Sequence, residues 1–317
     1  MSLAITGLHH VTAIAGDAQA NIDFYTGVLG LRLVKRTVNF DDPGTYHFYF
    51  GDEKGTPGSI LTFFPFQHAG PGRTGAGMAS AIAFALPEAA FDFWVERLAD
   101  NAMDFDGPER RFGENIVAFS DPDGLRIELI AVSHKGETSG WVGGPVSPEQ
   151  AISYIHSVTL CVDAAAGTAN LLTDAMGFER QDEDGDRLRL KASGGEVDSF
   201  IDLACQPDQL YGAMGIGTFH HVAFRAAHDE EQQAWCKLLV EEGLNVTPII
   251  DRQYFRSIYF REPGGVMFEI ATDPPGFLID EPPEALGQVL KLPALLEGKR
   301  DRIERALPPI RIPADGR

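Results

Sequence analysis

The sequence predicts an α+β fold in which one unit, βαβββ, is repeated four times and the four units form two domains. Four apolar strands recur along the chain, and each is followed by an amphipathic helix. Short period-2 runs separated by turn residues come after each helix, as expected for hairpins. Self-similarity of this kind at regular intervals is the sequence signature of a repeated architecture. We number the units as modules one to four in chain order.

Each module begins with an alternating apolar strand and a helix. In the segments that follow the strands, apolar residues recur at i, i+3 and i+4, which buries one helical face. Three of the helices end at Gly30, Gly177 and Gly243, each followed by an apolar residue, and this suits a left-handed helix C-cap. The four opening strands are expected at Leu8 to Ile14, Met78 to Leu86, Ile155 to Val162 and Phe219 to Phe224.

The later strands of each module are separated by turns. Gly55-Thr-Pro-Gly58, Asp121-Pro-Asp-Gly124 and Pro263-Gly-Gly265 are such turns, and their glycines and prolines suit tight reversals. The strands expected on either side are Tyr46 to Phe50 and Ser59 to Phe64, Ile116 to Phe119 and Leu125 to Ile130, Arg187 to Lys191 and Val197 to Leu203, and Ser257 to Phe260 and Val266 to Ile270.

The chain of 317 residues is long enough for two domains of roughly 150 residues each. Gly, Ser and Pro are concentrated between Ser133 and Gln150, which predicts a linker between the halves. We therefore expect an N-terminal domain of two modules over residues 1–142 and a C-terminal domain of two modules over 143–273. A proline-rich tail, 274–317, follows, with one helix expected from Ala294 to Ala306.

Charge and composition indicate a soluble cytoplasmic protein. With 26 basic and 46 acidic residues the net charge is −20, and such a surface repels nucleic acid and anionic lipid. No basic and apolar leader and no run of membrane-spanning length is apparent, so we expect no membrane association. Cys161, Cys205 and Cys236 are widely spaced and read as reduced thiols. A homodimer is an open expectation.

The sequence His-His-Val occurs twice, at His9-His10-Val11 and at His220-His221-Val222, each time on an apolar strand. Glu269 lies on a further apolar strand, 48 residues after His221. Two imidazoles and one carboxylate, with coordination positions left open, form the ligand set typical of non-haem Fe(II) oxygenases. A buried glutamate costs several kcal/mol unless it is paired or metal-bound, so Glu269 needs a partner. The pattern indicates a metalloenzyme.

Several phrases together resemble the vicinal oxygen chelate superfamily, which includes glyoxalase I, bleomycin-resistance proteins and extradiol ring-cleaving dioxygenases. Within it, the chain is most similar to the hydroquinone-type ring-cleaving dioxygenases, over about residues 1 to 273. The phrases are Asp23-Phe-Tyr-Thr-Gly-Val-Leu-Gly-Leu31, Asp121-Pro-Asp-Gly-Leu-Arg-Ile-Glu128, Glu262-Pro-Gly-Gly-Val-Met-Phe-Glu269, Leu8-His-His-Val-Thr12, Val34-Lys-Arg-Thr37, Gly55-Thr-Pro-Gly58 and the stretch from Asp251 to Glu269.

The resemblance implies that modules pair into curved open barrels, and that each pair forms a cup with inward-facing slots for metal ligands. Each module offers one slot early on its first strand and one on its last strand. Aligning the repeats puts His10, Ala81, His156 and His221 in the first slot, and Thr62, Glu128, Ser199 and Glu269 in the second.

Only two pairings of modules offer three ligands. Modules one and four give His10, His221 and Glu269, whereas modules three and four give His156, His221 and Glu269. We prefer the first set, because modules one and four share the His-His doublet and because the hydroquinone-type enzymes use that pairing. His156 stays the alternative metal ligand. On this view His156 donates to a backbone carbonyl in the other cup, and Glu128 pairs with an arginine or makes a structural hydrogen bond there.

By the same resemblance, Thr12, His220, Arg252 and Tyr259 line the substrate pocket, with His220, Arg252 and Tyr259 as catalytic residues. Arg252 could stabilise phenolate or peroxide charge, and His220 could act as a general acid–base. His9 is assigned with Thr12 to substrate binding, although on a flat strand the side chains that precede the ligands would point away from the metal. As ordinary alternatives, Arg252 could form a surface ion pair and Tyr259 could belong to the core. We expect no site role for His47, His68, His134 and His228.

The resemblance therefore implies an Fe(II)-dependent extradiol-type dioxygenase that opens a hydroquinone or related hydroxylated aromatic ring with both atoms of O2. Mn(II) also fits such a ligand set. Two rivals stay open. A glyoxalase-like isomerase or lyase would use Zn or Ni and a fourth ligand, where this chain has Thr62. A metal-free protein that binds a small hydrophobic compound would not need a complete triad.

Overall fold

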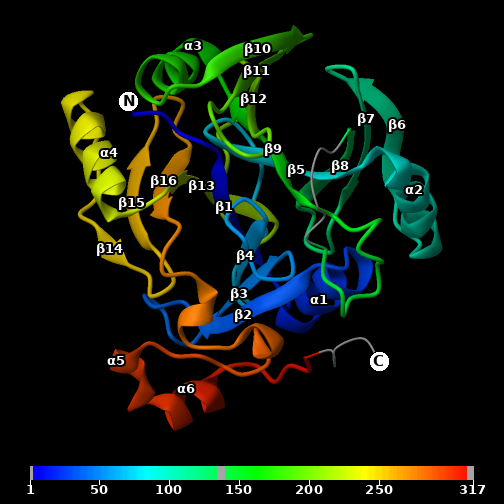
Figure 1. Ribbon diagram of the computed structural model, residues 1–317, viewed down its shortest axis with the longest axis vertical. Helices are drawn as coiled ribbons and strands as arrows, with labels where there is room; N and C mark the ends of the chain where they lie inside the picture. Colours follow the sequence, from blue (N-terminus) through cyan, green and yellow to red (C-terminus); the bar gives the residue numbers. More distant parts are fainter. Residues whose placement is uncertain (1–2, 134–139, 313–317) are drawn as a thin grey trace.

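The computed structural model describes residues 3–133 and 140–312, and it contains two eight-stranded mixed sheets. Each sheet curls into a half-barrel, and the two lie next to each other with helices on their outer faces (Figure 1). The expected α+β fold of four βαβββ modules, paired into curved open barrels, is confirmed. Residues 134–139, inside the expected linker, and residues 313–317, at the end of the expected tail, lie outside the described residues.

Each module supplies four strands and one main helix. Module one holds β1 (Leu8–Ala15), α1 (Ala18–Asp23), β2 (Arg32–Val38), β3 (Tyr46–Gly51) and β4 (Ile60–Pro65). Module two holds β5 (Met78–Pro87), α2 (Phe91–Asp100), β6 (Phe105–Arg111), β7 (Glu114–Ser120) and β8 (Arg126–Val132). Module three holds β9 (Tyr154–Val162), α3 (Ala165–Asn170), β10 (Glu179–Asp184), β11 (Arg187–Lys191) and β12 (Phe200–Cys205). Module four holds β13 (Thr218–Ala226), α4 (Asp229–Glu241), β14 (Ile250–Asp251), β15 (Arg256–Arg261) and β16 (Met267–Thr272).

The sheet order shows which modules pair. One sheet runs β14-β15-β16-β13-β1-β4-β3-β2, so modules four and one share it. The other runs β10-β11-β12-β9-β5-β8-β7-β6, from modules three and two. We call the concave faces of these sheets the one–four cup and the two–three cup. Both sheets therefore draw on both halves of the chain, and the domain boundaries at residues 142 and 273 stay a prediction.

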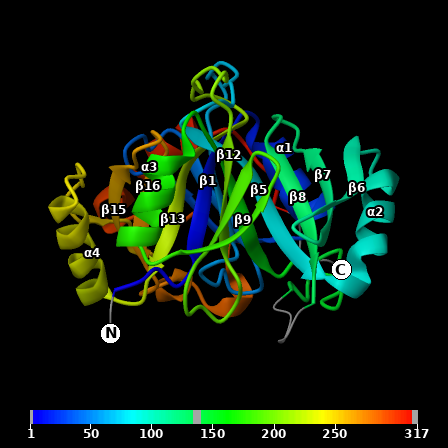
Figure 2. The same cartoon turned by 90° about the horizontal axis from the view of Figure 1, so that it is seen from above.

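The hydrophobic core lies on the faces of the sheets opposite the cups. Alternation along a strand sends successive side chains to opposite faces, so Val11 and Val222 join the core while the histidines beside them face the cup. Val11 and Val222 belong to the same buried cluster as Ile82 and Val158 of the other sheet. One continuous core thus holds the two sheets together, and Figure 2 shows α4 and β15 at one end of the molecule and α2 and β6 at the other.

The helices end much as expected. Gly30, Gly177 and Gly243 have φ values of +67°, +78° and +84°, a left-handed conformation that glycine adopts without strain. The first and third module helices each finish in a π-helical turn, at Phe24–Val28 and Leu171–Ala175, which the apolar spacing did not reveal.

The tail covers β2 instead of extending away from the molecule (Figure 1). It contains two short helices, α5 (Ala294–Glu297) and α6 (Arg300–Ala306), where one helix over 294–306 was expected. Lys35 of β2 is fully buried and forms ion pairs with Asp280, at 2.6 Å, and with Glu281. In the described part of the chain, no helix is long and apolar enough to cross a membrane.

Candidate metal centre

Two β-bulges determine how the His-His doublets face the one–four cup. In the antiparallel pairing of β1 with β13, Leu8 faces Phe224 and His10 faces Ala223, so His9 is an extra residue. On the opposite strand Thr12 faces His221 and Ala13 faces Phe219, so His220 is extra. A bulge re-aims the side chains around it and is frequent next to active sites. The bulges are the local distortion that lets His10 and His221 point at each other.

Three side chains converge at the centre of this cup. The Nε2 atoms of His10 and His221 lie 3.2 Å apart, and Oε2 of Glu269 is 3.4 Å from the first and 2.8 Å from the second. All three residues are buried, with at most 6% of any of them exposed. They are the one group within the described residues whose ligand atoms could together hold a metal ion.

The neighbouring histidines assign the tautomers of this group. Nδ1 of His10 lies 2.9 Å from Nδ1 of His9, and Nδ1 of His221 lies 2.8 Å from Nδ1 of His220. When His10 and His221 offer their Nε2 lone pairs to a metal, their protons must sit on Nδ1 and be donated to His9 and His220. A metal-ligating histidine usually donates its other ring N–H in this way. The second histidine of each doublet is thus oriented by the first.

Glu269 is positioned by the turn that precedes β16. The Glu262 carboxylate accepts hydrogen bonds from the backbone N–H groups of Gly264 and Val266, both at 2.8 Å, and Gly265 adopts φ +96°. This turn sets the register in which Glu269 lies opposite Tyr259 on β15. Ser257 then donates to Oε1 of Glu269 at 2.5 Å, which leaves Oε2 directed at the two histidines.

The electrostatics of the group favour a bound cation. Burial alone raises the pKa of Glu269, but His10 and His221 outweigh it and hold that pKa well below its usual value, so the carboxylate is ionised. Burial lowers the pKa of His221 and, to about 3, that of His220, so both imidazoles are neutral. As metal ligands, His10 and His221 would be neutral imidazoles, so with the Glu269 carboxylate the ligand set carries a net charge of −1, which a divalent cation would compensate.

The donor geometry fits a divalent metal. When the protons of His10 and His221 sit on Nδ1, Oε2 of Glu269 has no donor among the described residues, and its nearest neighbours are the two Nε2 atoms. Such orphaned buried oxygens are uncommon in native proteins. Metal bonds of about 2.0–2.2 Å to nitrogen and oxygen at right angles would place neighbouring ligand atoms about 3 Å apart. The measured separations of 2.8–3.4 Å agree with this spacing.

A cavity of about 330 Å³ adjoins the group, in the range of small-molecule sites. Thr12, His220, Arg252 and Tyr259, which sequence reasoning assigned to the pocket, all line this cavity. His9 does not line it, since its ring packs on His10 and, at 5.1 Å, on Phe255. The other lining residues are His10, Asn39, Phe40, Asp41, His47, Tyr49, Phe64, His221, Thr247, Ile250, Phe255 and Met267.

Arg252 and Tyr259 form a pair on the wall of the cavity. Nε of Arg252 lies 3.3 Å from the Tyr259 hydroxyl, and its guanidinium also approaches the exposed Asp41 at 3.2 Å. Although burial opposes it, the interactions with Tyr259 and Asp41 raise the pKa of Arg252, which stays cationic. Burial raises the pKa of Tyr259 well above its ordinary value, so its hydroxyl remains a donor. Both alternatives considered for these residues, surface ion pair and core tyrosine, are therefore only partly right.

The expectation that His47 has no site role is wrong as regards position, because His47 lies on β3 and lines the cavity. The signal was present in the sequence Tyr46-His-Phe-Tyr-Phe50. Phe48 and Phe50 belong to the core, so by alternation His47 and Tyr49 face the cup. The Oγ1 atoms of Thr12 and Thr62 are 2.8 Å apart, and Nε2 of His47 lies 2.9 Å from Thr62 Oγ1.

Comparison with known proteins agrees with this fold and site. The model of the glyoxalase/bleomycin resistance protein/dioxygenase superfamily matches residues 7–129 and 154–270. The chain belongs to this superfamily. It is 46% identical over 98% of its length to “Putative ring-cleaving dioxygenase MhqO” of Bacillus subtilis (strain 168), covering 99% of that protein. It is 37% identical to the chlorohydroquinone/hydroquinone 1,2-dioxygenase of Sphingobium indicum, covering 96% of each chain.

A solved structure extends the similarity to three dimensions. The crystal structure of a “putative dioxygenase” from Bacillus subtilis superposes with a TM-score of 0.94 at 46% identity, covering 98% of this chain and 99% of the other. The expected family is confirmed. The expectation of a ring-cleaving dioxygenase is also confirmed, because the similarity to such enzymes extends over the full length of the chain.

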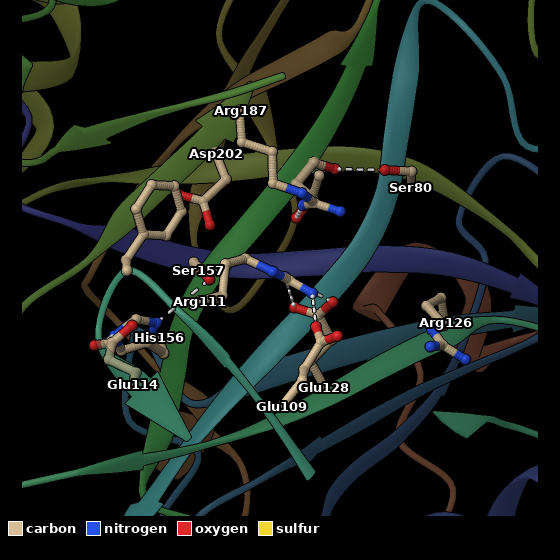
Figure 3. Close-up of polar contacts among 12 residues, drawn as sticks. Ser80, Glu109, Arg111, Glu114, Arg126, Glu128, His156, Ser157, Arg187 and Asp202 are labelled. Atoms are coloured by element: carbon tan, nitrogen blue, oxygen red, sulfur yellow. Dashed lines mark hydrogen bonds and ion pairs between the residues drawn. The ribbon is translucent and has the colours of Figure 1, made fainter. Parts of the chain in front are cut away.

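The two–three cup has the same backbone plan but another set of side chains (Figure 3). In the pairing of β5 with β9 the extra residues are Ser80 and His156. His156 therefore corresponds to His9 and His220, one residue away from the ligand slot that the repeat alignment assigned to it. Its Nε2 lies 3.1 Å from Oε1 of Glu114, so the expected donation to a backbone carbonyl is wrong. His156 belongs to β9, whereas His221 belongs to β13 of the other sheet.

The last-strand slots of the two–three cup hold carboxylates. Glu128 lies opposite Ala83, as Glu269 lies opposite Ala223. In module three the equivalent pairing joins Thr159 to Asp202, so the assignment of Ser199 is wrong: β12 begins only at Phe200, and counting from the turn glycine fell short.

An arginine closes each of these carboxylates. Arg111 Nη1 donates to both oxygens of Glu128 at 2.9 Å, as expected for that residue. Arg189 donates to both oxygens of Asp202 at 2.8 Å. The carboxylate charges of this cup are thus compensated by the protein itself.

Proposed function

We propose that this protein is an Fe(II)-dependent extradiol-type dioxygenase that opens the ring of a hydroquinone or a related hydroxylated aromatic with O2. The observation that carries the proposal is the buried His10, His221 and Glu269 group beside a cavity of about 330 Å³, with Oε2 of Glu269 facing the Nε2 atoms of both histidines. The similarity to a chlorohydroquinone/hydroquinone 1,2-dioxygenase supports the substrate class. Mn(II) would suit the same ligands.

Bound Fe(II) would bring the electron-rich ring and O2 together and allow electrons to pass between them. The protein's own groups have separate tasks. Arg252 presents a fixed positive charge toward oxygen atoms that become negative during the reaction. Tyr259 offers a neutral hydroxyl next to it, since its pKa is raised by burial. Phe64 and Phe255 provide apolar contact surface for an aromatic ring in the same cavity.

We propose that His220 donates a hydrogen bond to the bound substrate or to O2. Its Nδ1 accepts the proton of His221 Nδ1 whenever His221 is a ligand through Nε2, so the proton of His220 resides on Nε2. His220 lines the cavity, and burial holds its pKa down at about 3. A neutral imidazole with Nε2–H donates a hydrogen bond to an oxygen of the bound ring or of O2 and so stabilises negative charge that develops on that oxygen.

The two rival functions fit the site less well. A glyoxalase-like isomerase would need a fourth ligand in the slot of Thr62, but the Thr62 hydroxyl is engaged with Thr12 and His47. A metal-free binding protein would have no use for a buried carboxylate held 2.8 Å from one imidazole and 3.4 Å from another, because burying a charge costs stability and confers nothing on apolar binding.

The test begins with metal analysis of protein purified without O2, followed by O2 uptake after reconstitution with Fe(II). We expect uptake of one O2 per ring opened with hydroquinone as substrate, without flavin, nicotinamide or 2-oxoacid. A parallel panel of catechols compares the two orientations of the hydroxyl groups. Ring cleavage by metal-stripped protein, or thiol–aldehyde isomerisation with Zn or Ni and no O2 uptake, would contradict the proposal.

A further inference from the structure

A chain of four hydrogen-bonding groups runs along the wall of the cavity from the metal centre to its aromatic side. The Thr12 hydroxyl contacts the Thr62 hydroxyl at 2.8 Å, and Thr62 contacts Nε2 of His47 at 2.9 Å. Nδ1 of His47 contacts the Tyr49 hydroxyl at 2.9 Å. Thr12, His47 and Tyr49 all line the cavity. The catalytic residues proposed above include none of Thr62, His47 and Tyr49.

Each group in the chain has one proton to give. If Thr62, which is fully buried, uses its own proton within the chain, the whole chain points in one of two directions. Either Tyr49 donates to His47, His47 to Thr62 and Thr62 to Thr12, or every bond runs the opposite way. The first direction leaves the Thr12 proton without an acceptor among the described residues. The second leaves the Tyr49 proton without one.

The surroundings of the two ends select the first direction. The Tyr49 ring lies among aromatic side chains, with centroids at 5.1 Å to Phe277, 6.2 Å to Tyr254 and 6.4 Å to Phe255. A hydroxyl proton left over there would be desolvated and unsatisfied. Thr12 instead follows His10 by two residues on the same strand and lines the cavity. Its proton is therefore available to an oxygen of a molecule bound beside the metal ligands.

We propose that His47 is a positioning residue which, held between Tyr49 and Thr62, keeps the Thr12 hydroxyl as a hydrogen-bond donor to an oxygen of the bound aromatic substrate. This inference rests on the proposed function for the identity of the ligand. The pocket would then select a ring oxygen that can accept a hydrogen bond at the metal end. His47 must carry its proton on Nε2.

The internal symmetry of the one–four cup explains why a histidine stands there. Thr62 lies opposite Tyr49 as Glu269 lies opposite Tyr259, and His47 occupies the position of Ser257. In module four the serine donates to the metal-binding carboxylate. In module one the same two positions hold a histidine and a threonine, so the slot binds no metal and transmits a hydrogen bond to Thr12. Burial lowers the pKa of His47, which keeps its imidazole neutral and able to accept as well as donate.

The tautomer of His47 is the first test, and it does not depend on catalysis. In metal-free protein labelled with ¹⁵N-histidine, the ring-nitrogen and ring-proton correlations of a neutral imidazole distinguish Nε2–H from Nδ1–H. The His47→Gln variant identifies the signals by their loss. We expect the Nε2–H form for His47. The Nδ1–H form, or a protonated ring at neutral pH, would overturn the proposal.

The second test cuts the chain without touching its ends. Thr62→Val removes one hydroxyl at nearly constant volume, and Thr62→Ser retains it. For the Fe(II)-loaded enzyme we expect Thr62→Val to raise the KM for hydroquinone about two- to tenfold, the range for one neutral hydrogen bond, with kcat within about twofold. Thr62→Ser should behave as the wild type. Equal KM values for the wild type and Thr62→Val, or equal defects in the two variants, would overturn the proposal.

A double-mutant cycle separates positioning from general damage. If Thr62 acts only through the Thr12 hydroxyl, adding Thr62→Val to Thr12→Val should raise KM no further. Anaerobic calorimetric titration with hydroquinone gives the same comparison as binding affinity. Additive effects of the two substitutions would contradict the proposal. Failure of the wild type to consume O2 with hydroquinone would instead contradict the proposed function, and would leave the tautomer result standing.

Discussion

The one–four cup and the two–three cup have the same backbone plan and differ in what satisfies their carboxylates. Each has a bulge on both central strands and an acidic residue on a last strand. In the one–four cup Oε2 of Glu269 faces the Nε2 atoms of His10 and His221, and no Arg or Lys among the described residues bonds it. In the two–three cup Arg111 and Arg189 close Glu128 and Asp202. The same backbone thus forms a cation site where histidines face the carboxylate and an ionic network where arginines pair with it.

The difference shows that an acidic residue at the ligand position of the last strand is by itself a weak indicator of metal binding. A guanidinium with parallel N–H groups satisfies both oxygens of a carboxylate and removes its affinity for a cation. Glu128 and Glu269 stand at equivalent strand positions and follow similar turns. Arg111 bonds both oxygens of Glu128, whereas Oε2 of Glu269 faces the two Nε2 atoms with which it could share a metal ion. The neighbouring cation, and not the acidic residue, distinguishes the cups.

The largest expected effect separates the two glutamates. Glu269→Gln removes the anionic ligand at nearly constant volume, and we expect Fe(II) affinity to fall by more than about 100-fold, because removing a partner of a ligand already costs 10–100-fold. O2 uptake should be lost with it. Glu128→Gln should leave both unchanged. Metal analysis after gel filtration, with circular dichroism as the control for folding, gives the comparison.

Equal loss of metal in the two glutamine variants would break the comparison, since it would mean that both cups contribute ligands. Full metal retention by Glu269→Gln would also contradict the comparison, because it would mean that Glu269 is not a ligand.

Breaking the ionic network should affect stability and leave the metal bound. Arg189 is almost fully buried and bonds Asp202 at 2.8 Å and Glu114 at 2.6 Å. Arg189→Met strands the buried Asp202, and we expect the free energy of unfolding to fall by about 3–5 kcal/mol. Adding Asp202→Leu should recover much of this loss, because both charges are then gone. Urea unfolding of the two variants measures the difference, and a double variant as unstable as Arg189→Met would contradict the account.

Much of this comparison was available from the sequence. The count of ligands left two pairings of modules, one with four and three with four, and the repeated His-His-Val phrase together with the family resemblance favoured one with four. The positions of the doublets and of Glu269 could be predicted from the sequence because they depend on strand alternation and on one local turn. The glycine helix ends at Gly30, Gly177 and Gly243 were predictable for the same reason.

What could not be predicted depends on pairing across strands. His156 appeared to occupy a ligand slot because nothing in its own strand reveals the bulge, which exists only relative to β5. Asp202 was missed in favour of Ser199 because the length of the preceding turn has no sequence marker. His47 was overlooked although its alternation with Phe48 was visible, since its role requires knowing that β3 faces Thr62 on β4.

A smaller effect is expected from the group that orients the ligand. Ser257 donates to Oε1 of Glu269, at 2.5 Å, and so directs Oε2 toward the histidines. Ser257→Ala should lower Fe(II) affinity by about 10–100-fold while leaving the fold intact, the range for outer partners of metal ligands. Competition with a chelator of known affinity measures it. Ser80→Ala, at a bulge of the two–three cup, is the matched control and should leave metal affinity unchanged.

The smallest effect is expected at His156, which sequence reasoning offered as the alternative ligand to His10. His10→Ala should lose the metal, whereas His156→Ala should keep it and lose only about 1–2 kcal/mol of stability through one hydrogen bond and ring packing on Phe200. A metal lost from His156→Ala and kept by His10→Ala would reverse the pairing of the modules.

The stability difference between wild type and His156→Ala should also depend on pH in a stated direction. Burial raises the pKa of Glu114, but hydrogen bonds and charge from His156 and Arg189 outweigh it and lower that pKa below its ordinary 4.5. A carboxylate whose folded-state pKa is depressed contributes stability above its unfolded-state pKa and loses it as pH falls through the folded value. The difference between wild type and His156→Ala should therefore be largest near neutral pH and shrink below about pH 4.5. Urea unfolding at several pH values measures it, and a difference that grows on acidification would show that Glu114 is not the partner that matters.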